Sequence, residues 1–312
     1  MTMLLQTLVV LLVAPLTVGL VRKCKARFQN RRGASIFQPY SALLALMKKD
    51  MTITRYSSWV FRSVPFVVFG CALVLAALAP TLAHGTGSVF DNLFLIAGIL
   101  ALGSVFLVFG GMDTASTFGN MGSSREMTIA ALVEPALFTV FASLGLLASS
   151  WGMGDIAAFF ANSTWVAVVP IASITLVGLL FVVLAENARY PVDNPATHLE
   201  LTMVHEAMVL EYSGPYLALL EYASAVKLTV LGVFLVTLAL PIDRMLAALP
   251  LGAAALIALL IKILVTAFAI AFIESTIVKM RFYRMQEYMS LAFLFAVGGC
   301  VLIVISKYLG LV

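Results

Sequence analysis

The chain alternates along its whole length between long apolar runs and short polar segments. Many of the runs are about twenty residues long, the length that an α-helix needs to cross a bilayer. Backbone groups inside the hydrocarbon core must bond within their own segment, so these runs are expected to be helical. The short alternating segments of a membrane β-barrel do not occur in the sequence. We therefore predict an all-α, polytopic membrane protein of about eight transmembrane helices, at roughly 3–21, 63–83, 91–110, 127–149, 165–185, 222–240, 251–273 and 288–309.

Positive charges indicate the side of the membrane on which each connecting segment lies. The first run is not a typical cleaved signal, because basic residues follow it rather than precede it, which places the N-terminus outside. With eight spans, the inner segments are 22–62, 111–126, 186–221 and 274–287. They hold fifteen of the nineteen Lys and Arg residues, whereas the outer segments hold only Arg244 and Lys307. We expect one transmembrane domain over residues 1–312, multi-pass in the cell inner (plasma) membrane, with both termini outside.

Composition excludes several classes of function. The chain is 62% hydrophobic and 11% charged, and its formal net charge of +4 arises in the first inner segment, so it implies no nucleic-acid partner. Cys24, Cys71 and Cys300 are far apart and show no CxxC spacing, so no local motif for a metal or an iron–sulfur cluster is present. The sequence also contains no phosphate-binding loop, nucleotide fingerprint or nucleophile–base motif. We expect no cofactor or metal in this chain, which by itself is a non-catalytic subunit.

The first inner segment, 22–62, is basic and then amphipathic. It is dense in cations up to Arg32, and Gly33 ends that stretch. Apolar residues then recur at helical spacing, followed by two lysines: Ile36, Phe37, Tyr40, Leu43, Leu44, Met47, Lys48 and Lys49. This pattern predicts an amphipathic helix lying on the inner surface of the membrane. The segment is either a topology anchor that touches anionic lipid or a docking surface for a peripheral subunit, and the two roles are compatible.

The third inner segment, 186–221, is acidic and begins AENARYPVDNPATHLELTMVHEAMVLEYSGP. If 197–211 is a helix, Glu200 and Glu211 share a face, because eleven residues turn through about 1100°. His198 and His205 are seven residues apart and share another face. No HExxH motif is present, because Val209 stands where the second His would be, so a metal site is not favoured. A proton relay or a polar contact with another subunit fits these residues better.

Ionisable residues also occur inside the apolar runs, where each charge costs roughly 2.5–3.5 kcal/mol on insertion scales. Lys262 is near the middle of its run, and Glu134 is about 12 Å deeper along its helix than Glu126. A lysine beside Glu134 would let that carboxylate ionise, which suits proton transfer. The alternatives are a static buried pair for Lys262 and Glu134, and a side chain that reaches the inner surface for Lys227. Asp113 and Glu274 are either part of the path or solvated helix ends.

The chain resembles the complex I subunit 1 family over nearly its whole length, and four stretches carry the resemblance: ARFQNRRGASIFQPYSALLALMKKD, GGMDTASTFGNMGSSREMTIAALVEPALF, AENARYPVDNPATHLEL and EYSGPYLALLEYASAVK. Quinone-reducing members typically show AE-x-x-R-x-PFDLPE-x-E-x-EL, which this chain matches at Glu186, Arg189, Pro191, Asp193, Pro195, Glu200 and Leu201. Ala196 and His198 replace two glutamates of that form, and Ala34 replaces a proline of the basic segment. These details are closer to the membrane-hydrogenase branch, of the formate hydrogenlyase and hydrogenase-4 type.

The resemblance implies an eight-helix membrane anchor for a nickel–iron hydrogenase module. Its partners would be a hydrogenase large subunit and an iron–sulfur small subunit, which carry the nickel–iron centre and the clusters, together with antiporter-like membrane subunits and the lipid bilayer. The resemblance and the depth of the charges together suggest a proton path through Glu134, Glu186, Asp193, Glu200, Glu211, Glu221, Lys227 and Lys262. Docking is expected at Arg27, Arg31, Arg32, His198, His205 and Glu206. Two other functions remain open: the quinone-site subunit of a NADH-quinone oxidoreductase, and a purely structural anchor.

Overall fold

The computed structural model describes residues 2–81, 91–163, 165–193, 204–246, 251–278, 280 and 284–309. Nearly all of these residues are helical. Eight long helices coincide with the eight expected spans: α1 (Thr2–Phe28), α3 (Trp59–Leu78), α4 (Leu93–Asp113), α5 (Thr117–Ala148), α7 (Trp165–Glu186), α9 (Gly214–Ala239), α11 (Leu251–Thr276) and α12 (Met285–Tyr308). Within the described residues, seven are long and apolar enough to cross a membrane, and α7 adds a shorter apolar stretch, Pro170–Glu186. The prediction of an all-α membrane protein with about eight spans is confirmed.

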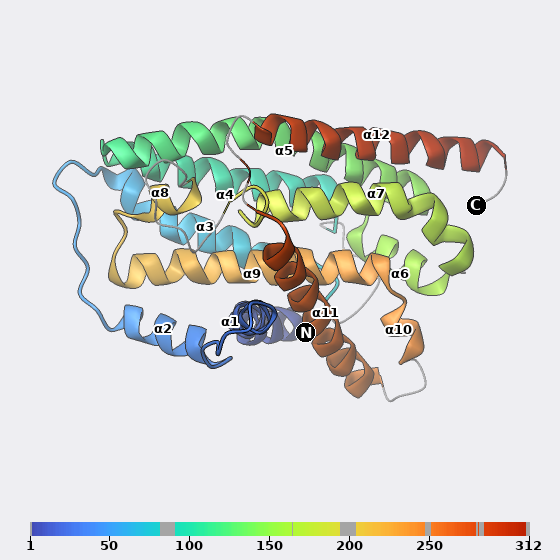
Figure 1. Ribbon diagram of the computed structural model, residues 1–312, viewed down its shortest axis with the longest axis horizontal. Coiled ribbons are helices and arrows are strands. Elements are labelled where there is room, and N and C mark those ends of the chain that lie inside the picture. The colour runs from blue at the N-terminus through green and yellow to red at the C-terminus, as the bar shows by residue number, and fades with distance from the viewer. Residues whose placement is uncertain are drawn as a thin grey trace.

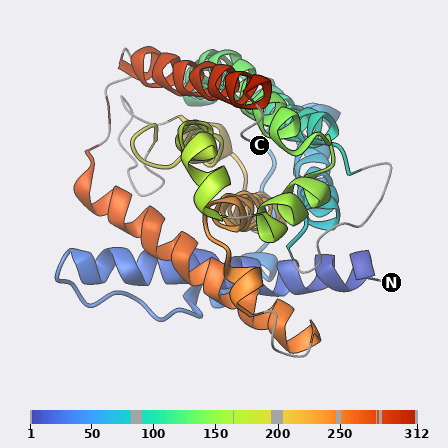
Figure 2. The same ribbon diagram turned by 90° about the vertical axis from the view of Figure 1, so that its right-hand side faces the viewer.

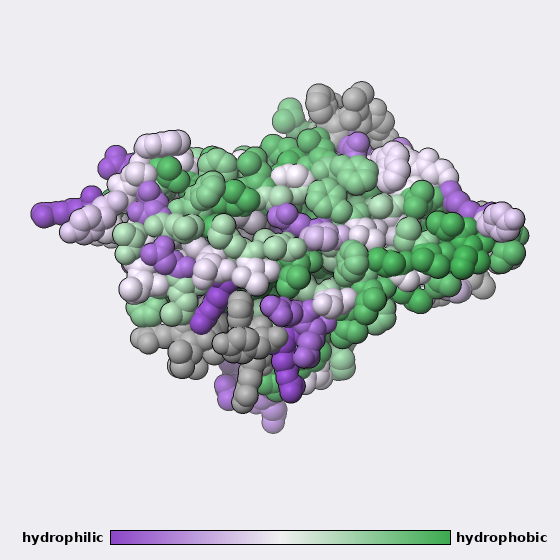
Figure 3. Space-filling view, turned by 90° about the horizontal axis from the view of Figure 1, so that it is seen from above, coloured by the Kyte–Doolittle hydropathy of each residue, from purple (hydrophilic) through white to green (hydrophobic). Residues whose placement is uncertain are grey.

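The long helices do not all run the same way. In Figure 1, α3, α4, α5, α7, α9 and α12 lie along the long axis of the molecule. Helix α1 is seen end-on in Figure 1 and side-on in Figure 2, so it crosses α9 at a steep angle, and α11 packs obliquely on it. Apolar side chains cover most of the face in Figure 3, and hydrophilic ones gather at both ends and along one edge. This distribution is expected of a bundle whose middle faces lipid.

Prolines occur inside four of the spans, α1, α3, α5 and α7, and in α1 and α3 a tyrosine hydroxyl bonds to the carbonyl that the proline leaves free. Pro15 in α1 has no N–H to donate to the Leu11 carbonyl, which instead accepts a 2.8 Å hydrogen bond from the Tyr222 hydroxyl. Pro65 in α3 likewise frees the Phe61 carbonyl, which accepts a 3.3 Å bond from Tyr212. Because both tyrosines belong to the start of α9 or the turn before it, these bonds hold α9 against α1 and α3.

Four short helices connect the spans: α2 (Gln38–Met47), α6 (Met153–Asn162), α8 (His205–Val209) and α10 (Ile242–Met245). The expected surface helix of the first inner segment is α2, and it packs against both α1 and α9. Helix α6 begins where the Asp91 carboxylate accepts hydrogen bonds from the backbone N–H groups of Met153 and Gly154, at 3.2 and 2.8 Å. That contact closes the start of α6 in the usual manner of a capping carboxylate.

A single helix over 197–211 is wrong for its last residues. The helix α8 ends at Val209, and Glu211 lies in a turn. The chain must turn here because α9 begins at Gly214, which has a φ of 55°, and has a proline in its first turn. A side chain at Gly214 would also come within 2.9 Å of the Asp50 carbonyl oxygen. Residues 197–203, which include His198 and Glu200, lie outside the described residues.

Candidate functional site

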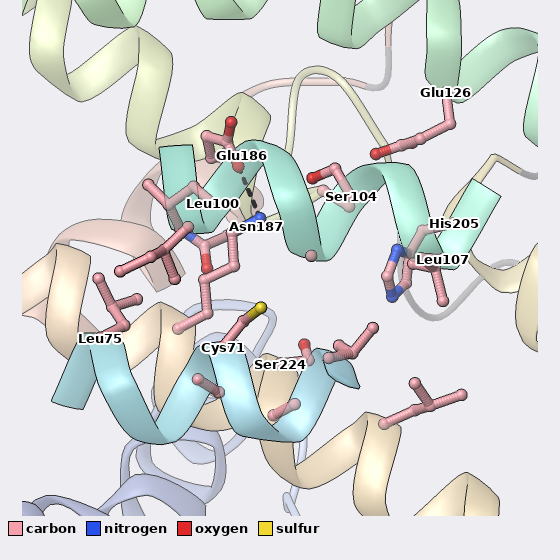
Figure 4. A pocket seen from close by; sticks show the side chains of 18 residues that line it. Cys71, Leu75, Leu100, Ser104, Leu107, Glu126, Glu186, Asn187, His205 and Ser224 are labelled. Atoms are coloured by element: carbon pink, nitrogen blue, oxygen red, sulfur yellow. Dashed lines mark ion pairs between the residues drawn. The ribbon is translucent and has the colours of Figure 1, made fainter. Parts of the chain in front are cut away.

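A cavity of about 80 Å³ lies between α3, α4, α5, α9 and the inner end of α7 (Figure 4). Its volume accommodates several water molecules. One wall is apolar and consists of residues on α3 and α4, among them Val68, Ala72, Leu75 and Leu100. Titratable and polar side chains line the rest: Cys71, Ser104, Glu126, Glu186, Asn187, His205, Ser224 and Lys227. These groups come from six separate elements, so only the folded chain places them around one space.

The centre of the polar wall is an ion pair between two helices. The Lys227 Nζ atom lies 2.6 Å from Oε2 of Glu186. Lys227 is in the middle of α9, and Glu186 is the last residue of α7. Their side chains keep 23% and 8% of their exposure, which reflects their contact with the cavity. The pair offsets the cost of placing either charge there, while the cavity leaves room for water to reach both groups.

Glu126 and His205 are drawn on the side of the cavity away from Glu186, with Ser104 between (Figure 4). His205 opens α8, and its backbone N–H donates a 3.2 Å hydrogen bond to the Asp193 carboxylate. Burial lowers the pKa of His205 to about 4; the carboxylate of Asp193 opposes this shift, and the charge of Lys227 adds to it. The imidazole is therefore neutral at physiological pH, with one nitrogen that accepts a proton and one that donates it.

A second cavity of about 70 Å³ adjoins the first on the side of the acidic segment. The two share five lining residues: Asn187, Ala188, His205, Leu220 and Ser224. The second cavity is also lined by Arg189, Asp193, Glu206 and Glu221, and Glu221 is exposed. The two adjoining cavities, together called the passage below, lie between the acidic segment and the ion pair of Lys227 and Glu186.

A buried ionic cluster fastens the wall of this passage. The Glu274 carboxylate, whose side chain is 1% exposed, lies 2.8 Å from Lys25 Nζ and 3.2 Å from Nη1 of Arg189. The Lys25 ammonium also lies 4.8 Å from the centre of the Tyr190 ring. The cluster joins the C-terminal ends of α1 and α11 to the loop after α7. Glu274 is thus not a solvated helix end. Its carboxylate links Arg189, which lines the second cavity, to α1 and α11.

Asp113 has a structural role that its sequence position did not reveal. Its carboxylate accepts hydrogen bonds from the Ser58 N–H at 2.7 Å, the Ser58 hydroxyl at 2.6 Å and the Phe61 N–H at 3.3 Å. These donors belong to the start of α3, where N–H groups lack helical partners. Asp113 therefore closes the first turn of α3 and holds it beside the end of α4.

Lys262 lies outside both cavities. Its ammonium is 2.7 Å from Oδ2 of Asp243, on the short helix α10. The Lys262 side chain is 1% exposed and that of Asp243 is 20% exposed. The sequence suggested that Lys262 or Lys227 would lie beside Glu134. In the structure the two lysines pair with other carboxylates, Lys262 with Asp243 and Lys227 with Glu186. The sequence did not indicate Asp243 as a partner of Lys262, because Asp243 belongs to a short polar segment of the kind found in any loop between two spans.

The remaining predicted residues do not line either cavity. Glu134 is half-buried on α5. Arg27 is exposed at the end of α1, and Arg31 and Arg32 are exposed after it. The cavities add residues that the sequence did not single out: Cys71, Ser104, Glu126, Asn187 and Ser224. Of these only Glu126 could have been noticed in the sequence, because it is a carboxylate eight residues before Glu134. Its position beside Arg125, however, is typical of a solvated helix end. Among the described residues no cluster of three or more His, Cys, Asp or Glu suits a metal ion.

Comparisons with known proteins agree over most of the chain. The family model described as NADH dehydrogenase matches residues 1–305. Hydrogenase-4 component C of Escherichia coli (strain K12) is 31% identical over 296 residues, which cover 92% of this chain and 90% of the relative. Formate hydrogenlyase subunit 4 of the same organism is 28% identical over 280 residues, covering 89% and 90%. The H subunit of NADH-quinone oxidoreductase from Anaplasma phagocytophilum (strain HZ) is 28% identical over 244 residues, covering 70% of each.

The fold also matches a solved structure. A chain in the structure of the membrane-bound sulfane sulfur reductase, an archaeal respiratory membrane complex, superimposes with a TM-score of 0.80. The match covers 97% of this chain and 100% of that chain at 17% sequence identity. At that identity the likeness establishes a shared fold.

Proposed function

Since the chain belongs to the NADH dehydrogenase family, in which it resembles membrane subunits of hydrogenase-4 and formate hydrogenlyase, we propose that it is the membrane anchor and coupling subunit of an energy-converting nickel–iron hydrogenase. It docks a hydrophilic redox module and links electron transfer to proton translocation in the inner (plasma) membrane. The nickel–iron centre and the iron–sulfur clusters belong to partner subunits, and antiporter-like membrane subunits lie beside this chain.

The observation that carries the proposal is the pair of adjoining cavities. They connect the acidic segment to an ion pair in the middle of a membrane-spanning helix, and water in them would link the titratable groups. In the proposed path a proton passes from the side of Glu206 and Glu221 to His205 and on to Glu126 and Glu186. Separating Lys227 from Glu186 makes each charged form less stable, so a change in the geometry of the pair would move a proton.

Docking is proposed on the same side. The exposed cations Arg27, Arg31 and Arg32 and the acidic segment from Glu186 to Glu221 both belong to segments that the distribution of positive charge places inside. A partner that rests on both would contact the mouth of the passage. The ionic cluster of Glu274 with Lys25 and Arg189 supports this arrangement, because it ties the loop beside the passage to the end of α1.

The test compares Glu186→Gln with Glu287→Gln in the assembled complex. Glutamine keeps the shape of Glu186 but removes the ionisable group, so we expect hydrogenase subunits to co-purify and electron transfer to continue while proton translocation falls to background. Translocation is measured with a pH-sensitive dye in vesicles supplied with an electron donor. Glu287 is the matched control, because it is an exposed glutamate in the first turn of α12 and lines neither cavity.

Three results separate the proposal from the two alternatives. Loss of translocation in Glu186→Gln alone supports a coupling role. Normal translocation per electron in the assembled Glu186→Gln complex leaves a structural anchor. Reduction of a quinone analogue by the purified complex favours the function for which the NADH-quinone oxidoreductase relative is named.

A further inference from the structure

The segment before α2 folds back along the inner end of α1. A side chain on Gly33 would meet the side chain of Ala26, and one on Gly19 would overlap the carbonyl group of Ile36. Further along, the Tyr40 hydroxyl donates a hydrogen bond to the Leu12 carbonyl oxygen. The last apolar residue of α1 before its cations is Val21. Helix α2 therefore begins beside the middle of the apolar part of α1, because Leu12 lies nine residues before Val21.

The other end of α2 is fastened at the start of α9. A Cβ on Gly214 would lie 3.0 Å from the carbonyl oxygen of Lys49, and the Thr52 N–H donates a 2.9 Å hydrogen bond to the Ser213 hydroxyl. Helix α9 begins there, at the inner end of a membrane span. The two ends of α2 are thus held by the protein, the first by α1 and the second by the start of α9.

One stripe of α2 has no covering element in the described chain. Phe37 and Leu44 are 68% and 62% exposed, and Met47 is 50% exposed. Phe37, Leu44 and Lys48 recur at helical spacing, so the apolar stripe ends at an exposed lysine. The opposite side, with Pro39 and Tyr40, lies against the protein.

This stripe continues a surface that faces lipid. Leu8 and Leu12 of α1 are exposed, as expected for a membrane-spanning helix at the edge of the bundle. Leu12 is also the residue whose carbonyl receives the Tyr40 hydroxyl, so α2 adjoins that face directly. An apolar stripe that joins the lipid-facing side of a span is covered by acyl chains rather than by a water-soluble protein.

The positive charges at the end of the stripe favour a lipid with an anionic head group. Lys48 and Lys49 are exposed, and neither takes part in an ion pair within the described part of the chain. A lysine at the end of an interfacial helix places its stem along apolar surface and its ammonium at the phosphate level. Basic residues next to a cytoplasmic-side interface attract anionic lipid.

We propose that α2 and the lysines that follow it form a binding surface for one class of ligand, an anionic phospholipid. An acyl chain covers Phe37, Leu44 and Met47, and the phosphate group is bound by Lys48 and Lys49. This role is separate from docking of the redox module, which uses Arg27, Arg31 and Arg32. The bound lipid holds the first inner segment in place against α1 and α9.

The experiment measures lipid retained by the purified complex. Native mass spectrometry compares phosphatidylglycerol with phosphatidylcholine on the unchanged complex and on the K48Q/K49Q variant, which keeps the length of both side chains similar. We expect phosphatidylglycerol affinity to fall about fivefold for each lysine removed, with phosphatidylcholine unaffected and the hydrophilic subunits still bound. Lys307→Gln is the control, because Lys307 is an exposed lysine at the far end of α12.

A second variant tests the apolar part without altering charge. Leu44→Ser should weaken retention of both lipids, because it removes apolar contact at the stripe. Equal retention of both lipids by the unchanged complex would overturn the proposal, and this measurement needs no variant to fold. Release of the hydrophilic subunits from K48Q/K49Q with unchanged lipid retention would also overturn it and identify the surface as a protein docking site.

Discussion

Two lysines in this chain occupy similar positions along their helices and have different surroundings. Lys227 is at the middle of α9 and lies 2.6 Å from Glu186, and Lys262 is near the middle of α11 and lies 2.7 Å from Asp243. The first pair forms part of a cavity wall with Glu126 and His205 nearby. The second lines neither cavity, and its lysine is 1% exposed.

The difference shows that a lysine near the middle of a long helix is not by that position alone a candidate for proton transfer. Both ammonium groups would be costly without a carboxylate partner, and both have one. Of the two pairs, that of Lys227 lines a described cavity together with further titratable groups, so the proposed proton route runs past this pair. The Lys262 pair instead ties α11 to α10, and it contributes to stability rather than to the proposed transfer.

The largest effect is expected from breaking the enclosed pair. Asp243→Ala leaves the buried Lys262 ammonium without its carboxylate and should destabilise the protein by about 3–5 kcal/mol. Lys262→Met should cost much less, because Met fills similar volume and the partly exposed Asp243 remains accessible to water. Thermal unfolding of the detergent-solubilised protein measures both. Equal losses of stability in the two variants would contradict the expectation that only the buried Lys262 depends on its partner.

A smaller effect is expected from comparing two carboxylates on α5. Glu126 lines the cavity and Glu134 does not, so Glu126→Gln should reduce proton translocation per electron by about tenfold and Glu134→Gln by less. Both variants should assemble, because glutamine keeps the size and hydrogen-bonding capacity of the side chain. The dye assay in vesicles measures translocation, and co-purification of partner subunits measures assembly. A larger loss in Glu134→Gln would place the path along α5 instead of through the cavity.

The smallest effect is expected from pH at the cavity wall. His205 has a folded pKa of about 4, whereas an unfolded histidine titrates near 6.5, so the unfolded chain binds more protons between these values. Stability from this group is therefore lost as pH falls, by about 1 kcal/mol between pH 7 and 5.5. His205→Gln should remove that part of the pH dependence of the unfolding midpoint. An unchanged pH profile in the variant would show that His205 does not cause this dependence.

Much of the fold and some of the candidate site were readable from the sequence alone. The expected spans correspond to eight helices because the length and apolar character of a span are local properties. Lys227 was proposed because a charge in an apolar run is conspicuous, and Glu186 because it matches the motif of the family that the chain resembles. The prediction of a helix over 197–211 is wrong at its end, because Gly214 and the proline after it begin a new helix. The spacing of residues that share a helix face does not show where a helix ends.

The sequence by itself determined that this is a helical membrane protein with basic and acidic segments on one side, because chain length, polarity and charge act along the chain. Tertiary structure alone decided which charges meet. It paired Lys25 with Glu274, 249 residues apart, and Lys262 with Asp243 rather than Glu134. It also gathered Glu126, His205 and the Lys227 pair around one cavity. The physical reason is that a buried charge is stabilised by whichever partner helix packing brings within a few ångströms, and packing depends on the shapes of all the helices together.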